Sequence, residues 1–377
     1  MGASVFQSMN GQWMGSVKGE SPGLVVFELD DYGTSLNGIA HHFPSDNSLP
    51  AVATRFSLKN RESKHRIRGC RIIPIHPTHG FALIDADITK YYPNSIVGDF
   101  ADIDIEILES GDVHIRYKTE VSEGEGTLLS SLAGSPSSLR RHSEAVDWNS
   151  FKSWAFNVEP QRYFYRGQST PKRLRTSFHR TNRKDISWYR DWDIPEMRRV
   201  LSAQLSHFFN LRDGDENGAF YSLLQHHGYP TPLLDWSLSP FVAAYFAFCA
   251  KPVGRPLDDV VRIYVFDAKR WRRDLQQHPY IAHVPPHFSI LDLHALENHR
   301  MVPQQAKATL TNVDDIETYL LKKSSENNHN YLIAVDLPST DRERALSELN
   351  MMGINAGSLF PGIDGTCEAM RYRNFEA

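Results

Sequence analysis

The sequence Leu224-Gln-His-His-Gly-Tyr-Pro-Thr-Pro-Leu-Leu-Asp-Trp-Ser237 connects a short helix expected over 221–227 to a second helix that begins at Pro240. Residues that precede proline adopt extended or turn conformations, so the two X-Pro pairs make this connection rigid. The second helix carries an apolar stripe that includes Phe241, Ala244, Tyr245 and Phe248. Two helices joined through a short, rigid, extended segment indicate a mixed α/β domain.

The polar and aromatic residues of this stretch have two interpretations. Asp235 can cap the following helix or hold an arginine, and Trp236 can pack in a core or stack on a nucleobase or nicotinamide ring. His226 or His227 can bind a hydroxyl group or take a proton, because imidazole titrates near neutral pH. The structural alternative is a rigid turn, but the concentration of polar groups favours a binding site.

An aromatic strand that ends in Arg-Gly lies upstream, in the stretch Tyr163-Phe-Tyr-Arg-Gly-Gln168. The Arg166 guanidinium can grip a phosphate with two parallel hydrogen bonds, and Gly167 lets the backbone approach a ligand because it has no Cβ. Alternatively, Arg166 ends the strand and pairs with a carboxylate. The basic run that follows either steers a polyanion toward the site or keeps a loop soluble; it contains Lys172, Arg173, Arg175, His179, Arg180, Arg183 and Lys184.

The N-terminal third has the pattern of an all-β unit. Ile103, Ile105 and Ile107 alternate with acidic residues, which predicts one buried side and one side in solvent. Several other short strands with turn residues between them indicate a small barrel or sandwich over residues 1–120. Residues 121–147 are rich in Ser and Gly and are expected to form a linker. Residues 148–377 then form the mixed domain, so the fold class is α+β.

Further elements of the mixed domain follow from periodicity and helix-end signals. Asp147 is expected to cap a helix, and residues 193–210 are expected to form an amphipathic helix. Buried strands are predicted over 260–266 and 331–335. Gly353 is the expected C-cap of a helix over 341–352.

The composition excludes several classes of protein. With 41% hydrophobic and 23% charged residues and a formal net charge of −4, the chain has no overall attraction to nucleic acid or membrane, so an anionic ligand needs a local positive cluster. Three separated cysteines without a CxxC pair, and no signal-like N-terminus, indicate a cytoplasmic protein. No metal is expected, because the adjacent histidines lack the i, i+4 spacing and no HExxH motif is present.

These motifs occur in an order that resembles the FRG domain, a bacterial family named after its (F/Y)RG motif. The N-terminal β segment also resembles a module that precedes some FRG domains. The matching segments are 165–168, 224–231, 233–236, 242–247 and 300–305, followed by Gly353-Ile354, Leu359-Phe-Pro361 and Asp364-Gly365.

The core of this domain is also similar to ADP-ribosyltransferases, which hold NAD with a strand that ends in Arg-Gly. Arg166-Gly167 matches that element, and Ser237 with the helix 243–247 matches the next. Residues 300–306 resemble the R-x-x-x-Q-A-E stretch of toxins that modify nucleic acids. Lys307 stands where those toxins carry the catalytic Glu, so Gln304, Gln305 or Asp235 would have to replace it.

This likeness implies an NAD-dependent ADP-ribosyltransferase, such as a toxin or antiviral-defence effector, that modifies nucleic acid or protein. NAD would be the substrate, and the N-terminal β unit would bind a protein partner or antitoxin. A nucleotide- or nucleic-acid-binding module without catalysis and a hydrolase of NAD or another nucleotide are the alternatives. The implied catalytic residues are Arg166, His227, Asp235 and Gln305, and the implied NAD-binding residues are Tyr165, Arg166, Gly167, Gln168, His226, Trp236 and Ser237.

Overall fold

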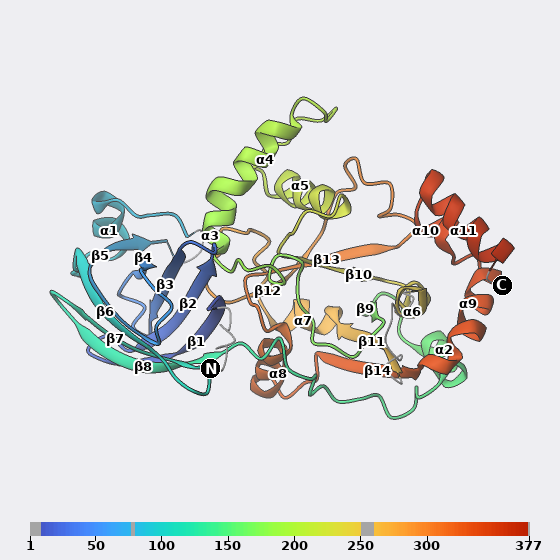
Figure 1. Cartoon of the computed structure of the whole chain (residues 1–377), viewed down its shortest axis with the longest axis horizontal. Coiled ribbons are helices and arrows are strands. Elements are labelled where there is room, and N and C mark those ends of the chain that lie inside the picture. The colour runs from blue at the N-terminus through green and yellow to red at the C-terminus, as the bar shows by residue number, and fades with distance from the viewer. Residues whose placement is uncertain (1–8, 77–79, 250–259, 376–377) are drawn as a thin grey trace, which may run out of the picture.

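Eight antiparallel strands in the N-terminal part of the chain close into a barrel, at the left of Figure 1. The computed structural model describes residues 9–76, 80–249 and 260–375. The helix α1 (Asp85–Tyr91) is inserted between the fifth and sixth strands. The strands are β1 (Gly11–Gly19), β2 (Gly23–Asp31), β3 (Leu36–Pro44), β4 (Ala51–Leu58), β5 (Lys64–Ile75), β6 (Phe100–Ile107), β7 (Val113–Thr119) and β8 (Glu123–Ser130).

The predicted alternation in β6 is confirmed. Ile103 and Ile105 are buried inside the barrel, while Asp104 faces outward and pairs with Arg68 at 2.9 Å. The expected linker over 121–147 differs from the structure, because β8 lies within it and pairs with both β1 and β7. Strand β8 is rich in glycine and lacks the alternation of apolar residues by which a strand is recognised in a sequence. The barrel nevertheless needs this strand in order to close. The segment that connects the two units begins after Ser130.

The second unit is a six-stranded antiparallel sheet covered by helices on both faces, with strand order β12-β13-β10-β9-β11-β14. Its strands are β9 (Tyr163–Gln168), β10 (Leu233–Ser237), β11 (Val260–Asp267), β12 (Phe288–Leu291), β13 (Ala306–Thr311) and β14 (Leu332–Pro338). Its α-helices are α2 (Trp148–Asn157), α3 (Ile186–Trp188), α4 (Ile194–Leu201), α5 (Gly214–His226), α6 (Pro240–Cys249), α7 (Ala268–Asp274), α8 (Ile316–Glu326), α9 (Arg342–Met351), α10 (Ala356–Leu359) and α11 (Ile363–Phe375).

The two faces of this sheet are covered differently. On one face, α7 and α8 pack on a core that runs across the sheet and includes Trp236, Phe266 and Trp271. On the other face there are two separate cores: α2, α6 and α9 cover β9, β11 and β14, while α4 and α5 cover β10, β12 and β13. This face therefore has a division between α5 and α6, above the place where β9 meets β10.

Most helix ends follow the sequence signals. Asp147 caps α2 by accepting a hydrogen bond from Ser150 N, and Gly353 follows α9 with a φ of 78°. The helix expected over 193–210 is shorter, because α4 ends at Leu201. The Ser202 hydroxyl there donates back to Arg199 O, a local bond that competes with helix continuation. Among the helices of the described residues, none has the length and hydropathy needed to cross a lipid bilayer.

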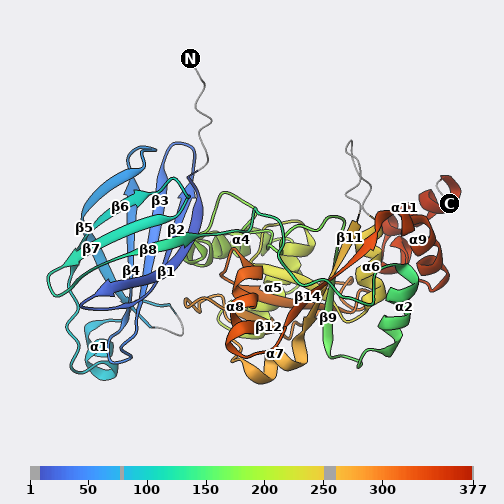
Figure 2. The same cartoon turned by 90° about the horizontal axis from the view of Figure 1, so that it is seen from below.

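The barrel packs against the second unit through the outer wall of its first strands, and the two units lie side by side along the long axis (Figure 2). Gln12 Nε2 donates to Asn312 O at 2.7 Å, and Gln12 Oε1 accepts from Asp314 N at 2.8 Å. Arg183 pairs with Asp30 at 3.0 Å. Buried polar groups with partners on both sides fix the orientation of the two units.

Glu28 is a buried carboxyl at this interface, with 3% of its surface exposed. It accepts a hydrogen bond from Gln12 Nε2 at 2.8 Å. Burial, with the nearby charge of Asp185, raises its pKa well above the usual 4.5. The native state therefore binds this proton more tightly than the unfolded state does. The stability that Glu28 contributes is present below pH 4.5 and is lost as the pH rises through the folded-state pKa.

We predict that Glu28→Gln stabilises the protein increasingly above pH 4.5, because glutamine keeps the acceptor oxygen and carries no charge. The gain at pH 8 over that at pH 5 should be on the order of 1 kcal/mol or more. Urea unfolding at both pH values measures it, and Glu109→Gln, at an exposed position, is the control. Equal stability differences at the two pH values would contradict the assignment.

Candidate functional site

Strands β9 and β10 are neighbours that barely pair. They share one paired position, Tyr165 with Ser237, and separate beyond it. Arg166 lies in the opening, where its Nη1 donates to the carbonyl oxygen of Asp235 at 2.7 Å. Within the described residues, its buried Nε has no hydrogen-bond partner. The guanidinium therefore has unused donors beside a gap in the sheet.

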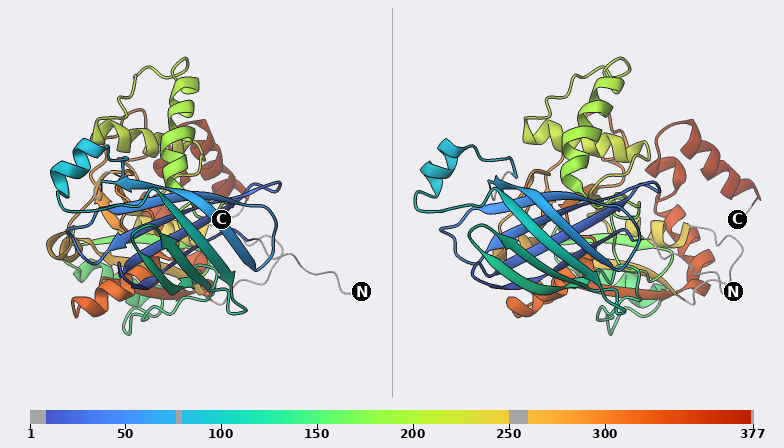
Figure 3. Two further views of the ribbon diagram at one scale, coloured as in Figure 1. Left: turned by 90° about the vertical axis from the view of Figure 1, so that its left-hand side faces the viewer. Right: turned by 60° about the vertical axis from the view of Figure 1, so that its left-hand side comes forward.

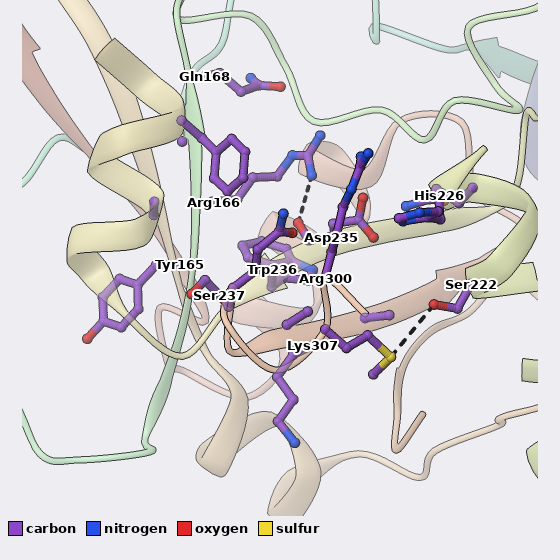
Figure 4. Close-up of a pocket in the computed structure, with 18 of the residues that line it drawn as sticks. Tyr165, Arg166, Gln168, Ser222, His226, Asp235, Trp236, Ser237, Arg300 and Lys307 are labelled. Atoms are coloured by element: carbon purple, nitrogen blue, oxygen red, sulfur yellow. Dashed lines mark hydrogen bonds between the residues drawn. The ribbon is translucent and has the colours of Figure 1, made fainter. Parts of the chain in front are cut away.

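A cavity of about 760 Å³ opens at this gap. It is bordered by β9, β10 and β13, by α5 and α6, and by the segment that precedes β13. The cavity thus occupies the division between the two helix groups. Figure 4 shows Arg166, Asp235, His226 and Arg300 around the same space. Its volume lies within the range of roughly 300–1,000 Å³ that is usual for sites of small molecules and cofactors.

Positive charge exceeds negative charge around this cavity. Arg166, Lys172, Arg180 and Arg300 line it, and none of the four has an ion pair within the part of the chain that is described. Burial lowers the pKa of the Arg166 guanidinium, and the charge of Arg180 acts in the same direction. Cations gathered in a partly buried place repel one another. An anionic ligand would relieve that repulsion.

Asp235 provides the one carboxylate among the lining residues that the structure describes. It points away from the core, because Leu234 and Trp236 on either side of it face α7 and α8. Its cross-strand neighbour on β13 is Ala308. Lys307 lies opposite Trp236 and points away from Asp235 (Figure 4). The acid of this site is therefore on β10, and the two residues of β13 nearest to it on the same face are Ala306 and Ala308.

His226 contributes an imidazole at the C-terminal end of α5. Burial lowers its pKa from the usual 6.5, and the neighbouring charge of Arg300 lowers it further. The ring is therefore neutral at physiological pH and has a nitrogen free to accept a proton. Ser222, one turn earlier on the same helix, also lines the cavity.

Two aromatic residues predicted to bind a ligand belong to the hydrophobic core. Trp236 is 3% exposed, and its Nε1 donates to Thr309 Oγ1 at 2.9 Å. Tyr165 is 3% exposed and packs edge-on against Trp154, pointing away from the other site residues in Figure 4. Both residues border the cavity, but their rings are packed in the hydrophobic core and offer little free surface to a ligand. Strand periodicity decides this outcome, because both side chains face the layers of helices.

Of the remaining predicted site residues, some line the cavity and others do not. Gln304 lines the cavity, but its Nε2 is engaged with Leu359 O at 2.9 Å. Gln305 lies outside the lining and adopts a φ of 47°. His227 is exposed beyond the end of α5 and does not line the cavity. Ser237 lines the cavity, although its hydroxyl donates to Gln304 O at 2.8 Å.

The basic run 172–184 divides into two groups. Lys172, Arg173, Arg175 and Arg180 all line the cavity. In the described residues Lys172 and Arg180 have no ion pair, whereas Arg173 and Arg175 are held by carboxylates. Arg173 is buried against Asp315 at 3.1 Å, and Arg175 pairs with Asp314 at 2.6 Å. The Lys184 ammonium donates to the carbonyl oxygens of His179 and Thr181. Part of the run is therefore structural, and the steering of a polyanion by Lys172 and Arg180 stays a prediction.

Phe246 and Phe360 are site residues that the sequence analysis did not assign. Both line the cavity, their rings meet edge-to-face at 5.9 Å, and the Arg300 guanidinium lies 5.2 Å from the Phe360 centroid. They offer the aromatic surface that Trp236 and Tyr165 do not. Phe246 is on the helix that begins at Pro240, and Phe360 belongs to the matching segment Leu359-Phe-Pro361, but neither was predicted to contact a ligand. The described residues contain no group of three or more His, Cys, Asp or Glu able to hold a metal ion.

Gly167 is the position where β9 touches α6. A Cβ there would lie 1.9 Å from Ala243 O and 2.6 Å from Ala247 N, both backbone atoms that cannot move alone. We predict that Gly167→Ala lowers the free energy of unfolding by about 3 kcal/mol because α6 must shift. Gly134→Ala is the matched control, since its Cβ would have no neighbour within 4 Å. Urea titrations of both variants provide the comparison, and equal midpoints would show that α6 is not held this way.

One comparison with known proteins matches a part of the chain that contains β9 and β10. Residues 161–254 match the FRG domain family. That range includes Arg166, Gly167, Gln168, His226 and Asp235, so most of the gap between β9 and β10 lies in the matched part. No curated protein and no solved structure matches the chain. The order of motifs predicted from the sequence and this match lead to the same conclusion: the chain contains an FRG domain.

Proposed function

We propose that the cavity binds NAD and that the protein transfers the ADP-ribosyl group of NAD to an acceptor. The observation that carries the proposal is the opening between β9 and β10. There Arg166, a cation whose Nε has no partner in the described residues, lies beside the lining carboxylate Asp235. A dinucleotide needs both features: positive charge for its pyrophosphate and a negative group near the ribose whose bond breaks.

The cations of the cavity support binding of the pyrophosphate. Arg166 and Arg300 extend into the cavity from opposite sides, and Arg180 and Lys172 add charge at its edge. Guanidinium groups bind phosphate oxygens in pairs of parallel hydrogen bonds. The rings of Phe246 and Phe360 provide apolar surface for the adenine or nicotinamide base.

The chemical step would break the bond between nicotinamide and ribose. The electron pair leaves with nicotinamide, and the positive charge that develops on the ribose is stabilised by the Asp235 carboxylate. The acceptor then forms a bond to the ribose carbon and loses a proton, which His226 can take because its ring is neutral. If water replaces the acceptor, the same residues hydrolyse NAD to free ADP-ribose.

Nucleotide binding without catalysis is the second candidate function. It is favoured by Lys307, a cation on β13 where the similar toxins carry a glutamate, and by the alanines that flank it. Under this proposal the same cations would hold a nucleotide or the phosphates of a nucleic acid, and the bound molecule would leave unchanged.

We predict that the protein transfers label from NAD marked on the adenylate phosphate to a component of a cell lysate. Arg166→Ala should reduce the transfer at least 100-fold, since it removes the phosphate donor at the centre of the cavity. Arg199→Ala, at a side chain that is 78% exposed and outside the cavity, is the control and should leave transfer unchanged. Nuclease and protease treatment then identify the acceptor class. Release of free ADP-ribose would indicate a hydrolase, and intact NAD would exclude both reactions.

We further predict that Asp235→Asn separates binding from catalysis. Arg166 bonds the backbone carbonyl of residue 235, so the amide variant should keep the binding geometry and lose only the negative charge. Binding of the carbocyclic, non-cleavable analogue of NAD, measured calorimetrically, should change less than threefold, while NAD consumption should fall about 100-fold or more. Unchanged consumption would remove Asp235 from the mechanism. Binding by the wild type without consumption would favour the second candidate.

A further inference from the structure

The barrel has its own cavity, separate from the site in the second unit. Its volume is about 420 Å³, and every residue that lines it belongs to the barrel or to the loops at one of its ends. These loops connect β1 to β2, β3 to β4, β5 to β6 and β7 to β8. The cavity has no part in the function proposed above. In Figure 3 the barrel lies in front of the second unit, toward the viewer.

One end of the barrel is filled and the other is hollow. At the filled end, large side chains form a continuous core, and Trp13 Nε1 donates to Gly111 O at 2.8 Å. At the hollow end, inward positions carry small residues such as Ala40, Val52 and Ala101. An eight-stranded barrel is just wide enough to be filled by its side chains or to hold one small ligand. The hollow half therefore has the dimensions of a ligand site.

The wall of this cavity is apolar and lacks positive charge. Val25, Phe27, Ile103 and Ile115 form much of it, and no lysine or arginine of the described residues lines it. Burial lowers the pKa of His42, the one lining imidazole, to about 4, so the ring is neutral at physiological pH. The lining carboxylate, Glu20, is in the loop between β1 and β2. An anionic ligand would find no cationic partner among the described lining residues, and a cation would find a carboxylate only in this loop at the open end.

The entrance carries exposed apolar side chains. Ile96 is 76% exposed and Val121 is 46% exposed, and both line the cavity at its open end. Core defects in folded proteins are usually smaller than a few water molecules, because interiors are packed as densely as organic crystals. A space of this size with an apolar rim differs from such a defect in both volume and access.

We propose that the open half of the barrel binds one small, neutral, lipophilic molecule. The enclosed volume limits the occupant to the size of a medium-chain alcohol or a two-ring aromatic compound. The apolar wall supplies the binding free energy, and the absence of lining cations excludes carboxylate lipids.

The test uses the full chain and N-phenyl-1-naphthylamine, a neutral dye whose fluorescence rises in apolar surroundings. We expect saturable binding at one site, with displacement by 1-decanol at least tenfold stronger than by decanoate or decyltrimethylammonium. Ala40→Trp and Val52→Phe fill the cavity and should each weaken dye binding at least tenfold. Leu129→Trp adds an aromatic ring on the outer wall, at a side chain that is 65% exposed, and should leave binding unchanged.

A second measurement does not depend on any variant. Nuclear Overhauser effects between bound 1-decanol and the methyl groups of Val52 and Ile103 in the wild type should place the ligand inside the barrel. Lack of saturable binding, dye binding that persists in both filled variants, equal displacement by the charged compounds or absence of these Overhauser effects would each overturn the proposal.

Discussion

Gly167 has no Cβ, and helix α6 lies against strand β9 for that reason. The backbone of Ala243 occupies the space that a side chain at 167 would need. This contact holds α6 over β9, while α5 is held over β10 by the core around Phe220 and Leu233. The two helices are attached to different strands, and those strands pair at one position. The cavity, its cations and Asp235 all depend on the gap that results.

The arginines of the second unit fall into two groups: those paired with carboxylates, and those without an ion pair in the described residues. Arg173 and Arg175 are neutralised by the adjacent carboxylates Asp315 and Asp314, which also anchor the segment that leads from the barrel. Arg166 and Arg300 have no such partner in the described residues, and they lie on the cavity. Even a partly buried cation without a partner is costly, and an anionic ligand would repay that cost. This contrast supports an anionic ligand more strongly than the number of arginines does.

The cavities of the barrel and of the sheet unit are lined by residues of opposite character. The cavity of the sheet unit is surrounded by guanidinium groups, while the cavity of the barrel is lined by hydrocarbon and a neutral imidazole. The interface between the units is formed by buried polar groups such as Gln12, Glu28 and Asp30 rather than by a large apolar core. Such an interface is stable only in one relative orientation of the two units, because each buried polar group needs its hydrogen-bond partner in place.

Local signals in the sequence determined the elements and the centre of the site. Period-two alternation predicted the β unit, end signals predicted the caps at Asp147 and Gly353, and Arg166-Gly167 with Asp235 was predicted as the core of the site. Only the tertiary structure decided which rings were free. Trp236 and Tyr165 are in the core because their strand positions face helices, while Phe360 reaches the cavity from a segment almost two hundred residues after Arg166. Propensity and spacing act within a few residues, but the closing of a barrel by β8 and the separation of β9 from β10 depend on contacts between segments that are distant in sequence.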